Sequence, residues 1–424
     1  MLKKVKKIDK PLCGEITIPA DKSVSHRAII FSSLAKGKSL ITNFSSGADC
    51  HSTLKLFKNL GVDIRFADEK TVEINSTGKL LKPNTDLDAG NSGTTMRLVT
   101  GILAGQNFYS KIIGDESLSK RPMKRIIEPL SLMGAEIKSI DNHAPLEIFG
   151  KDLQGINYNS KLASAQVKSC VLLAGLNASG TTTFSEPYIS RNHSELMLKY
   201  LGANIEVKNN SVTVSKSELI AKDIDIVGDI SSAAFFIVAG LIVPNSKFII
   251  KNVGINPTRV GIIDVVKRMN GNIKILNKSQ KAGEDVADIE VAYSPDLKAC
   301  EIQADDIPKL IDELPVIAVL ASQANGQTVV KNAEDLRNKE SDRIKSVVNE
   351  LTKIGVDITE TEDGFVINKS KLIGNAELES YHDHRLAMSF YVAGLICQNE
   401  ISIHGFEWTK ISFPEFEALF EKLS

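Results

Sequence analysis

The amino-acid sequence predicts an α/β protein built from six copies of a helix–strand–helix–strand–strand unit, grouped as two domains of three. Two recurring patterns and the chain length support this prediction. Six apolar stretches end in small residues and are followed by β-like runs. Five amphipathic stretches end in glycine and lead into a strand-like run. At 424 residues the chain exceeds one ordinary core, which favours two or three domains.

The first pattern marks the opening helix of each unit. Its stops are Leu34-Ala35-Lys36-Gly37, Leu103-Ala104-Gly105, Leu173-Ala174-Gly175, Val238-Ala239-Gly240, Leu320-Ala321-Ser322 and Val392-Ala393-Gly394. The alanines of these stops are separated by 69, 70, 65, 82 and 72 residues, which is longer than a solenoid repeat. We expect each glycine to follow directly after the end of its helix.

The second pattern marks the second helix of each unit. Its copies are Leu60-Gly61-Val62-Asp63-Ile64, Met133-Gly134-Ala135-Glu136-Ile137, Leu201-Gly202-Ala203-Asn204-Ile205, Asn270-Gly271-Asn272-Ile273 and Ile354-Gly355-Val356-Asp357-Ile358. The sixth unit lacks its strand, so we expect the N-terminal segment through Ile16-Thr17-Ile18 to complete it. The predicted domains are therefore 1–20 plus 228–424, and 21–227. A six-bladed propeller is disfavoured because every unit carries two helix patterns.

Composition and charge exclude several classes of protein. A formal net charge of −1 argues against a general nucleic-acid or membrane partner, so any anion site is local. No apolar run is long enough for a membrane helix, and no apolar segment of a signal peptide follows the basic N-terminus. We expect a cytoplasmic protein whose five cysteines are mostly buried free thiols, and no metal at His382 and His384.

A cluster of polar residues precedes each opening helix. The clusters are Lys22-Ser23 with Arg27; Gly90-Asn91-Ser92-Gly93-Thr94 with Arg97; Ser164-Ala165-Gln166 with Lys168; Gly228-Asp229-Ile230-Ser231-Ser232; Asp312-Glu313-Leu314-Pro315; and Asp383-His384-Arg385. Ordinary capping explains each cluster alone, and Asp21 to Arg27 alone also fits a capped basic turn. A cation just inside a helix start opposes the helix dipole, which is tolerable if an anion is bound there.

Six ordered motifs resemble those of one family. They are Asp21-Lys22-Ser23-Val24-Ser25-His26-Arg27-Ala28, Gly90-Asn91-Ser92-Gly93-Thr94-Thr95-Met96-Arg97, Arg121-Pro122-Met123, Ser164-Ala165-Gln166, Asn338-Lys339-Glu340-Ser341-Asp342-Arg343 and Asp383-His384-Arg385-Leu386-Ala387-Met388. Over essentially its whole length the chain resembles the 5-enolpyruvylshikimate-3-phosphate (EPSP) synthases, which are enolpyruvyl transferases. The resemblance implies the two-domain enolpyruvyl transferase fold, with three βαβαββ repeats per domain and a substrate cleft between the domains.

The resemblance also implies an activity and its partners. The expected reaction transfers the enolpyruvyl group of phosphoenolpyruvate to the 5-hydroxyl of shikimate 3-phosphate and releases phosphate, in the shikimate pathway of aromatic amino-acid and chorismate biosynthesis. No metal or other cofactor is expected. The expected partners are these two small molecules, with no nucleic acid and no membrane, and the expected state is a monomer.

By resemblance, particular residues of this chain bind the two substrates. Those expected to bind shikimate 3-phosphate are Lys22, Ser23, Arg27, Ser164, Ala165, Gln166, Arg191, Asp312 and Lys339. Those expected to bind phosphoenolpyruvate are Lys22, Asn91, Gly93, Arg121, Gln166, Arg343 and Arg385, and Lys339 is expected to contact this substrate as well. Arginine suits such sites because its guanidinium binds phosphate and carboxylate in a bidentate manner.

The chemistry gives a separate reason for the acidic residues. The hydroxyl must lose a proton while the methylene carbon of the enol gains one, so a base and an acid must reach one substrate carbon. Asp312, Glu340 and Lys22 match the family's catalytic residues. We assign Asp312 to the 5-hydroxyl and Glu340 to the methylene, although the two roles remain interchangeable at this point.

Some positions depart from the family pattern, and two other functions compete. Ala165 replaces a serine of many relatives, Leu98 a proline, and Lys410 lies one residue off the register of a family lysine. Gly93 leaves room for a small inhibitor such as glyphosate beside the phosphoenolpyruvate site. The transferases that act on UDP-N-acetylglucosamine carry a reactive cysteine in the loop corresponding to 114–122, which has none here. A non-catalytic anion-binding protein would not need Asp312 and Glu340.

Overall fold

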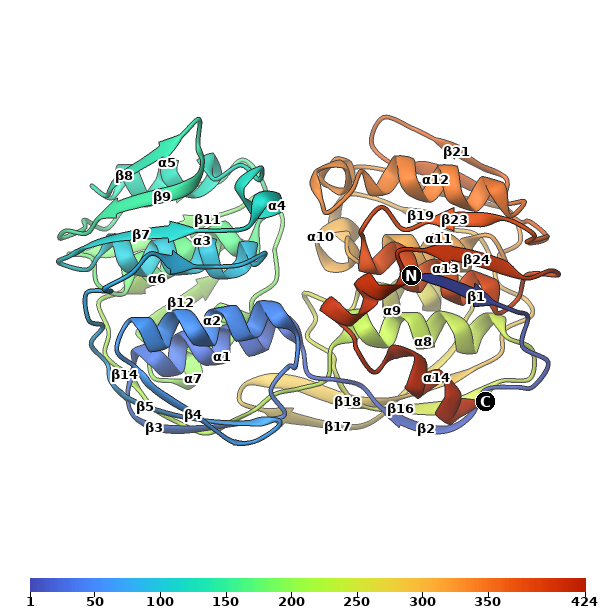
Figure 1. The fold of residues 1–424 in the computed structure, drawn as a ribbon, viewed down its shortest axis with the longest axis horizontal. Coiled ribbons are helices and arrows are strands. Elements are labelled where there is room, and N and C mark those ends of the chain that lie inside the picture. The colour runs from blue at the N-terminus through green and yellow to red at the C-terminus, as the bar shows by residue number, and fades with distance from the viewer. The chain divides into compact units, whose positions relative to one another are not determined.

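The computed structural model describes all residues from 1 to 424, and the chain forms two compact units (Figure 1). Unit 1 comprises Met1–Pro19, Gly228–Ser279 and Asp285–Ser424. Unit 2 comprises Ala20–Val227 and the short segment Gln280–Glu284. The sequence placed Ala20 and the segment 280–284 in the other domain. Ala20 belongs with unit 2 because it forms a β-bridge and the next residue, Asp21, donates its backbone N–H to Val227.

Unit 2 contains three sheets, each built mainly from one repeat. The first repeat comprises α1 (Lys22–Leu34), β3 (Ala35–Thr42), α2 (Ala48–Asn59), β4 (Asp63–Asp68) and β5 (Thr71–Thr77), with β14 (Leu219–Ile220) and β15 (Ile224–Asp225) beside β3. The second comprises β6 (Leu87–Asp88), α3 (Gly93–Ala104), β7 (Tyr109–Ile113), α4 (Glu116–Ser119), α5 (Lys124–Leu132), β8 (Glu136–Ile140) and β9 (His143–Phe149). The third comprises β10 (Asn157–Asn159), α6 (Ala165–Gly175), β11 (Thr181–Ser185), α7 (His193–Tyr200), β12 (Ile205–Lys208) and β13 (Ser211–Ser215).

Unit 1 repeats the same plan. Its first repeat comprises β2 (Cys13–Thr17), α8 (Ile230–Ile242), β16 (Lys247–Gly254), α9 (Gly261–Arg268), β17 (Asn272–Lys281) and β18 (Glu284–Ala292). The next comprises β19 (Glu301–Ile302), η1 (Ala304–Asp306), α10 (Ile307–Leu310), α11 (Leu314–Ala321), β20 (Gln327–Val330), η2 (Glu334–Asn338), α12 (Arg343–Lys353), β21 (Ile358–Glu360) and β22 (Phe365–Asn368). The last comprises β23 (Glu377–Glu379), α13 (His384–Gly394), β24 (Ile401–His404), η3 (Phe406–Ile411), α14 (Phe416–Leu423) and β1 (Leu2–Val5).

In the second, third, fifth and sixth repeats a strand directly precedes the opening helix, which the repeat pattern alone did not reveal. The first and fourth repeats receive the equivalent strand from elsewhere in the chain, as β14 with β15 and as β2. In each four-stranded sheet this strand lies parallel to the strand that follows the helix, for example β6 beside β7 and β19 beside β20. All of these strands except β2 are only two or three residues long, too short for a periodic pattern. The observed order is therefore βαβαββ, as the family resemblance implied.

The N-terminal segment completes two repeats, not one. Residues Leu2–Val5 (β1) pair antiparallel with β24 of the sixth repeat, as expected for a segment that closes this sheet. Residues Cys13–Thr17 (β2), which contain Ile16 and Thr17, instead pair parallel with β16 of the fourth repeat. The prediction was wrong for Ile16-Thr17-Ile18, because it treated two short strands as one.

Among the glycines of the first pattern, Gly105 directly follows its helix, α3, as predicted. The prediction was wrong for the others, because Gly175 and Gly394 are the last residues of α6 and α13, Gly240 lies inside α8, and Gly37 lies in β3. A Cβ at Gly240 would lie 2.8 Å from Phe248 Cε1, and one at Gly175 would lie 2.8 Å from Thr182 Cβ. These glycines therefore let the buried helix approach the strand that follows it, whereas Gly61, Gly134, Gly202 and Gly355 of the second pattern have φ between 86° and 94° and do follow helix ends.

The opening helices form the core of each unit. Residues of α8 and α11 are almost all buried, which explains their continuously apolar sequences. In unit 2, α3 packs against α6, and in unit 1, α11 packs against α13 and α8 (Figure 1). All five cysteines are free thiols, and Cys50, Cys170 and Cys397 are buried as expected, whereas Cys300 is partly buried and Cys13 is exposed. No helix is both long and apolar enough to cross a bilayer.

Candidate active site

The six predicted polar clusters all lie at the N-termini of the opening helices. The capping side chains of five are Asp21, Ser92, Ser164, Asp229 and Asp383, each accepting a hydrogen bond from a backbone N–H of the first turn. The remaining helix, α11, begins after Glu313 with Pro315 in its first turn. In α1 the cap is Asp21 and the helix begins at Lys22.

Lys22 and Ser23 occupy the first turn of α1 and are both partly exposed. The Lys22 Nζ atom lies 3.2 Å from Asp49 Oδ2, so its charge has a protein partner as well as access to solvent. His26, one turn further on, is buried and its Nδ1 lies 2.6 Å from Thr53 Oγ1. Burial lowers the pKa of His26 to about 3, and the charges of Lys22 and Arg27 add to this effect against that of Asp49.

Arg27 is only 3% exposed and its bonds hold three helices together. Its Nε donates to Ser194 Oγ of α7 at 2.8 Å and its Nη2 donates to Ser169 Oγ of α6 at 3.0 Å. Its Nη1 donates to the Ser23 carbonyl of α1 at 3.1 Å. Burial lowers the pKa of Arg27 to about 10, against the opposing effect of the Glu195 carboxylate. The structure thus places this predicted substrate ligand at a junction of helices.

Two arginines and two amides form a second group in unit 2. Arg97 of α3 donates from Nη1 to Gln166 Oε1 at 2.6 Å, which fixes the amide that then donates to Thr94 Oγ1 at 3.1 Å. Arg121 donates from Nη2 to Asn91 Oδ1 at 2.8 Å. Burial, together with the neighbouring charges of Arg121 and Arg125, lowers the pKa of Arg97 to about 10. The predicted residues Asn91, Arg121 and Gln166 therefore belong to two directly bonded pairs.

Gly93 is the point where these arginines approach the backbone. A Cβ at this position would lie 2.9 Å from Arg97 Nη1 and 3.6 Å from Arg121 Nη1. Glycine therefore leaves room that the two guanidinium groups use. The space beside Gly93, which the sequence analysis gave to a small inhibitor, is therefore bordered by the positive charges of Arg97 and Arg121.

The remaining predicted residues of unit 2 lie at or near the start of α6. Ser164 caps this helix, and the Ala165 carbonyl accepts a hydrogen bond from Ser169 Oγ at 2.6 Å. Arg191 lies in the loop before α7 and is partly exposed. The serine missing at position 165 would begin the same helical turn as Gln166.

In unit 1 the predicted residues surround one buried guanidinium, that of Arg343. Its Nε lies 2.7 Å from Asp383 Oδ2, its Nη2 lies 2.7 Å from Glu340 Oε2, and its Nη1 lies 3.5 Å from Asp312 Oδ1. The Arg343 and Asp383 side chains are 1% and 0% exposed. Burial would lower the pKa of Arg343, but the negative charges of Asp383, Glu340 and Asp312 outweigh this and raise it.

Lys339 and Arg385 complete this group. The Lys339 Nζ atom lies 3.6 Å from Asp312 Oδ1, so Asp312 lies near two cations. Arg385 Nη1 lies 3.5 Å from the Asp312 carbonyl and 4.0 Å from Glu313 Oε1. Unit 1 therefore brings together five predicted residues: Asp312, Lys339, Glu340, Arg343 and Arg385.

The structure also identifies residues to which the sequence assigned no role. Arg97 orients Gln166, and Asp383 holds Arg343 while its Oδ1 accepts the backbone N–H of Arg385 at 2.9 Å. Both lie inside quoted motifs, at positions that look like an ordinary helix residue and an ordinary cap. A cation inside a helix start was the available signal for Arg97. No sequence signal distinguishes Asp383 from a simple cap.

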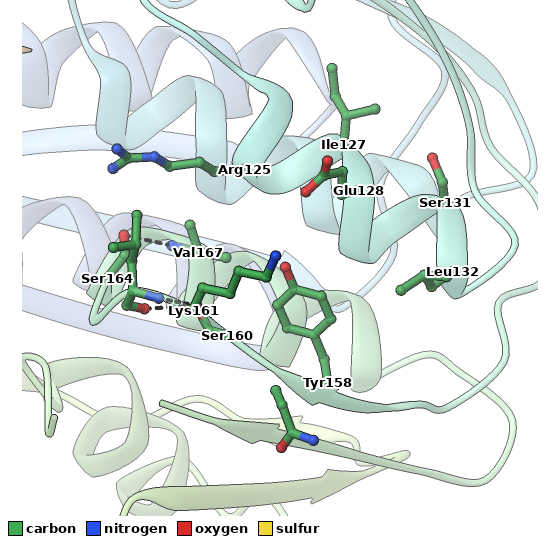
Figure 2. Close-up of a pocket in the computed structure, with 12 residues that line it drawn as sticks. Arg125, Ile127, Glu128, Ser131, Leu132, Tyr158, Ser160, Lys161, Ser164 and Val167 are labelled. Carbon is green, nitrogen blue, oxygen red and sulfur yellow. Dashed lines mark hydrogen bonds between the residues drawn. The ribbon is translucent and has the colours of Figure 1, made fainter. Parts of the chain in front are cut away.

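A pocket of about 620 Å³ lies elsewhere in unit 2, between α5 and the segment from β10 to α6 (Figure 2). Leu132, Leu162 and Val167 supply apolar parts of its lining, and Figure 2 shows the Lys161 side chain extending toward the Tyr158 hydroxyl. Ser164 is the only predicted site residue that lines it. The pocket therefore does not coincide with the arginine groups where phosphate would bind.

Comparison with known proteins identifies the family. The family described as EPSP synthase (3-phosphoshikimate 1-carboxyvinyltransferase) matches residues 6–420. The chain belongs to the EPSP synthase family. A curated 3-phosphoshikimate 1-carboxyvinyltransferase of Thermodesulfovibrio yellowstonii is 51% identical over 421 residues, covering 98% of both chains. That of Petrotoga mobilis is 50% identical over 418 residues, covering 97% of this chain and 96% of the relative.

Solved structures agree with this EPSP synthase fold. The EPSP synthase of Acinetobacter baumannii superposes with a TM-score of 0.91 at 42% identity, covering 100% of this chain and 98% of that one. The enolpyruvyl transferase NikO of Streptomyces tendae superposes with a TM-score of 0.81 at 16% identity, covering 100% of this chain and 97% of that one. At that identity, NikO shows that the two proteins share a fold.

Proposed function

We propose that this protein is a transferase that moves the enolpyruvyl group of phosphoenolpyruvate to the 5-hydroxyl of shikimate 3-phosphate and releases phosphate. This reaction is the enolpyruvyl-transfer step of the shikimate pathway. Full-length similarity to curated enzymes with this activity supports the proposal. The structural observation that carries it is the placement of Asp312 and Glu340 on one guanidinium, 3.5 Å and 2.7 Å from Arg343.

The reaction needs two proton-handling groups because two protons move. When the 5-oxygen bonds to the enol carbon, the hydroxyl releases its proton and the methylene carbon takes one up. When phosphate then leaves, the new methyl carbon returns a proton and the double bond forms again. Asp312 and Glu340 supply two carboxylates held at one cation, so each can act on its own side of the reacting carbon. We assign Asp312 to the hydroxyl and Glu340 to the methyl carbon, and the geometry also permits the reverse.

Cations of both units bind the anionic groups in this proposal. Shikimate 3-phosphate is bound by Lys22, Ser23, Arg27, Ser164, Ala165, Gln166, Arg191, Asp312 and Lys339. Phosphoenolpyruvate is bound by Lys22, Asn91, Gly93, Arg121, Gln166, Arg343 and Arg385. Lys22 also takes part in proton transfer. The hydrogen bonds of Arg121 support its assignment as a ligand of phosphoenolpyruvate. They go to the neutral groups of Asn91 and Ser117, which leaves the positive charge of Arg121 available to a phosphate.

We further propose that the protein works as a monomer in the cytoplasm. The family's substrates are small phosphorylated metabolites, and each proposed ligand comes from the one chain. Light scattering of the purified protein tests the first point. A mass near 46.2 kDa is expected for a monomer, and a mass twice as large would contradict it.

Phosphate release with both substrates present tests the activity. The unmodified protein should release phosphate only when shikimate 3-phosphate and phosphoenolpyruvate are added together. Glu340→Ala and Lys22→Ala should each lose most of this activity, whereas Lys208→Ala, an exposed lysine of β12, should retain it. Turnover of UDP-N-acetylglucosamine, with none of shikimate 3-phosphate, would overturn the proposal.

A further inference from the structure

We propose that Lys168 is a positioning residue that fixes the loop carrying Arg191, so that the shikimate 3-phosphate site is preformed. This inference rests on the proposed function. Lys168 lies in the first turns of α6 and its side chain is only 1% exposed. The sequence suggested that such a cation near a helix start is compensated by a bound anion. The structure shows instead that protein carboxylates compensate it.

The Lys168 ammonium is surrounded by three acceptor oxygens. Its Nζ donates to Glu186 Oε1 at 2.8 Å and to the Ser190 carbonyl at 3.1 Å, and it lies 2.7 Å from Glu195 Oε1. A lysine ammonium has three N–H groups, so all of them have acceptors inside the protein. Lys168 therefore cannot donate to a substrate, and any effect on the reaction is exerted through the groups that it holds.

The first of these groups is the loop between β11 and α7. Glu186 Oε1 accepts the backbone N–H and the hydroxyl of Ser190, both at 2.9 Å, in addition to the bond from Lys168. The loop from 186 to 190 is thus closed by a carboxylate and fastened to α6 at both of its ends. The residue that follows this closed loop is Arg191, the predicted ligand of the shikimate phosphate.

The second group links Lys168 to the Arg27 junction through α7. Glu195 lies beside Ser194, whose hydroxyl accepts from Arg27. Because Ser169 Oγ must donate to the Ala165 carbonyl at 2.6 Å, Ser194 must be the donor in its 2.6 Å bond with Ser169. One oriented chain of bonds thus runs from Arg27 to the backbone of Ala165.

The charges of this network cancel. Lys168 and Arg27 are positive, Glu186 and Glu195 are negative, and all four side chains are buried. Buried ion groups of this kind are often no more stabilising than apolar side chains of similar size. This network fixes the relative positions of three elements, because it joins the segments that carry Arg27, the Ser164–Gln166 turn and Arg191. An apolar substitute would leave the 186–191 loop without its anchor.

A double substitution tests this role without changing the net charge of the buried groups. Lys168→Gln/Glu186→Gln removes one cation and one anion of the network. The matched control is Lys208→Gln/Glu206→Gln, an exposed ion pair of the same unit with a 2.8 Å separation. The measurements are KM for each substrate and kcat from phosphate release, together with the melting temperature.

The network variant should raise KM for shikimate 3-phosphate by about tenfold or more, the loss expected when one charge-assisted hydrogen bond is misplaced. KM for phosphoenolpyruvate should change less than about threefold, and the control should change neither value. An unchanged KM for shikimate 3-phosphate would overturn the inference, as would an equal rise in both KM values. If the double variant does not fold, Glu186→Gln alone should give the same selective rise, smaller in size. Lack of turnover by the unmodified protein would instead refute the proposed function.

Discussion

Arginines beside the helix starts are held in opposite ways in the two units. In unit 2, the hydrogen bonds of Arg27, Arg97 and Arg121 go to hydroxyls, amide oxygens and backbone carbonyls. In unit 1, the buried Arg343 faces the carboxylates of Asp383, Glu340 and Asp312. Neutral partners orient an arginine without compensating its positive charge. Carboxylate partners compensate this charge and fix the position of the guanidinium group.

The two units therefore contribute different kinds of groups. Unit 2 presents oriented positive charge, which suits the binding of phosphates and carboxylates. Unit 1 presents paired acids beside cations, which suits proton transfer. An arginine substitution should therefore affect binding in unit 2, whereas loss of a carboxylate should affect catalysis or folding in unit 1.

The largest effect is expected from Glu340→Gln in unit 1. The amide keeps the shape of the side chain but cannot exchange a proton with the substrate carbon, so kcat should fall by about 100- to 10,000-fold. KM values should change little. Steady-state phosphate release measures both, with Glu334→Gln on η2 as an exposed control. A fall in affinity with kcat intact would show that Glu340 binds rather than catalyses.

Asp383→Asn should give the next largest effect, on stability. Asparagine retains an oxygen for the helix cap but removes a charge from the fully buried pair with Arg343. Breaking such a pair costs about 3 kcal/mol or more of unfolding free energy. Urea unfolding followed by circular dichroism measures it, with the exposed Asp357→Asn as control. Equal stability of the two variants would mean that Glu340 and Asp312 suffice to hold Arg343.

Arg97→Met in unit 2 should weaken binding while stability changes little. Gln166 loses its charged donor at 2.6 Å, which corresponds to about 1.5–3 kcal/mol and thus about a 10- to 100-fold rise in KM. Kinetics for both substrates provide the measurement, and Arg65→Met, an exposed arginine of β4, is the control. If Arg97→Met instead unfolded the protein at room temperature, Arg97 would be needed for stability, and the proposed difference between the arginines of the two units would be wrong.

The smallest effect concerns pH and the neutral His26. Its folded pKa of about 3 lies below the ordinary value of 6.5, so the unfolded chain binds the extra proton between these pH values. This contribution to stability is present above pH 6.5 and is lost as the pH falls toward 3. Between pH 6.5 and 5 the loss is about 1.5 kcal/mol. Unfolding at both pH values should show a smaller loss in His26→Gln than in the unmodified protein, and His143→Gln should behave like the latter.

The repeats and the helix starts could be predicted because they depend on local sequence. Apolar periodicity located all six opening helices, and polar caps located their N-termini. The Gly175 and Gly240 prediction failed because a glycine needed for close packing resembles one needed for a helix end. The two N-terminal strands could not be separated because their partners, β16 and β24, lie hundreds of residues away.

The sequence could predict which residues form the site, but not which hydrogen bonds and ion pairs they make with one another. Motifs placed Arg343, Glu340 and Asp312 in one functional set, and the structure brings them together. The choice of partner for each arginine depends on side chains far apart in sequence, such as Arg97 with Gln166 or Arg27 with Ser194. The carboxylates that compensate Lys168 were likewise hidden, because Glu186 and Glu195 look like ordinary surface residues in the sequence.

The pairing of β1 with β24 has a consequence for synthesis on the ribosome. All but five residues of unit 2 have been made once Val227 is added, whereas the last sheet of unit 1 needs both Leu2–Val5 and Ile401–His404. The first strand of the chain, β1, therefore remains unpaired while nearly four hundred further residues are translated. The basic residues Lys3 and Lys4 of β1 help here, since charged side chains keep an unpaired strand from joining another.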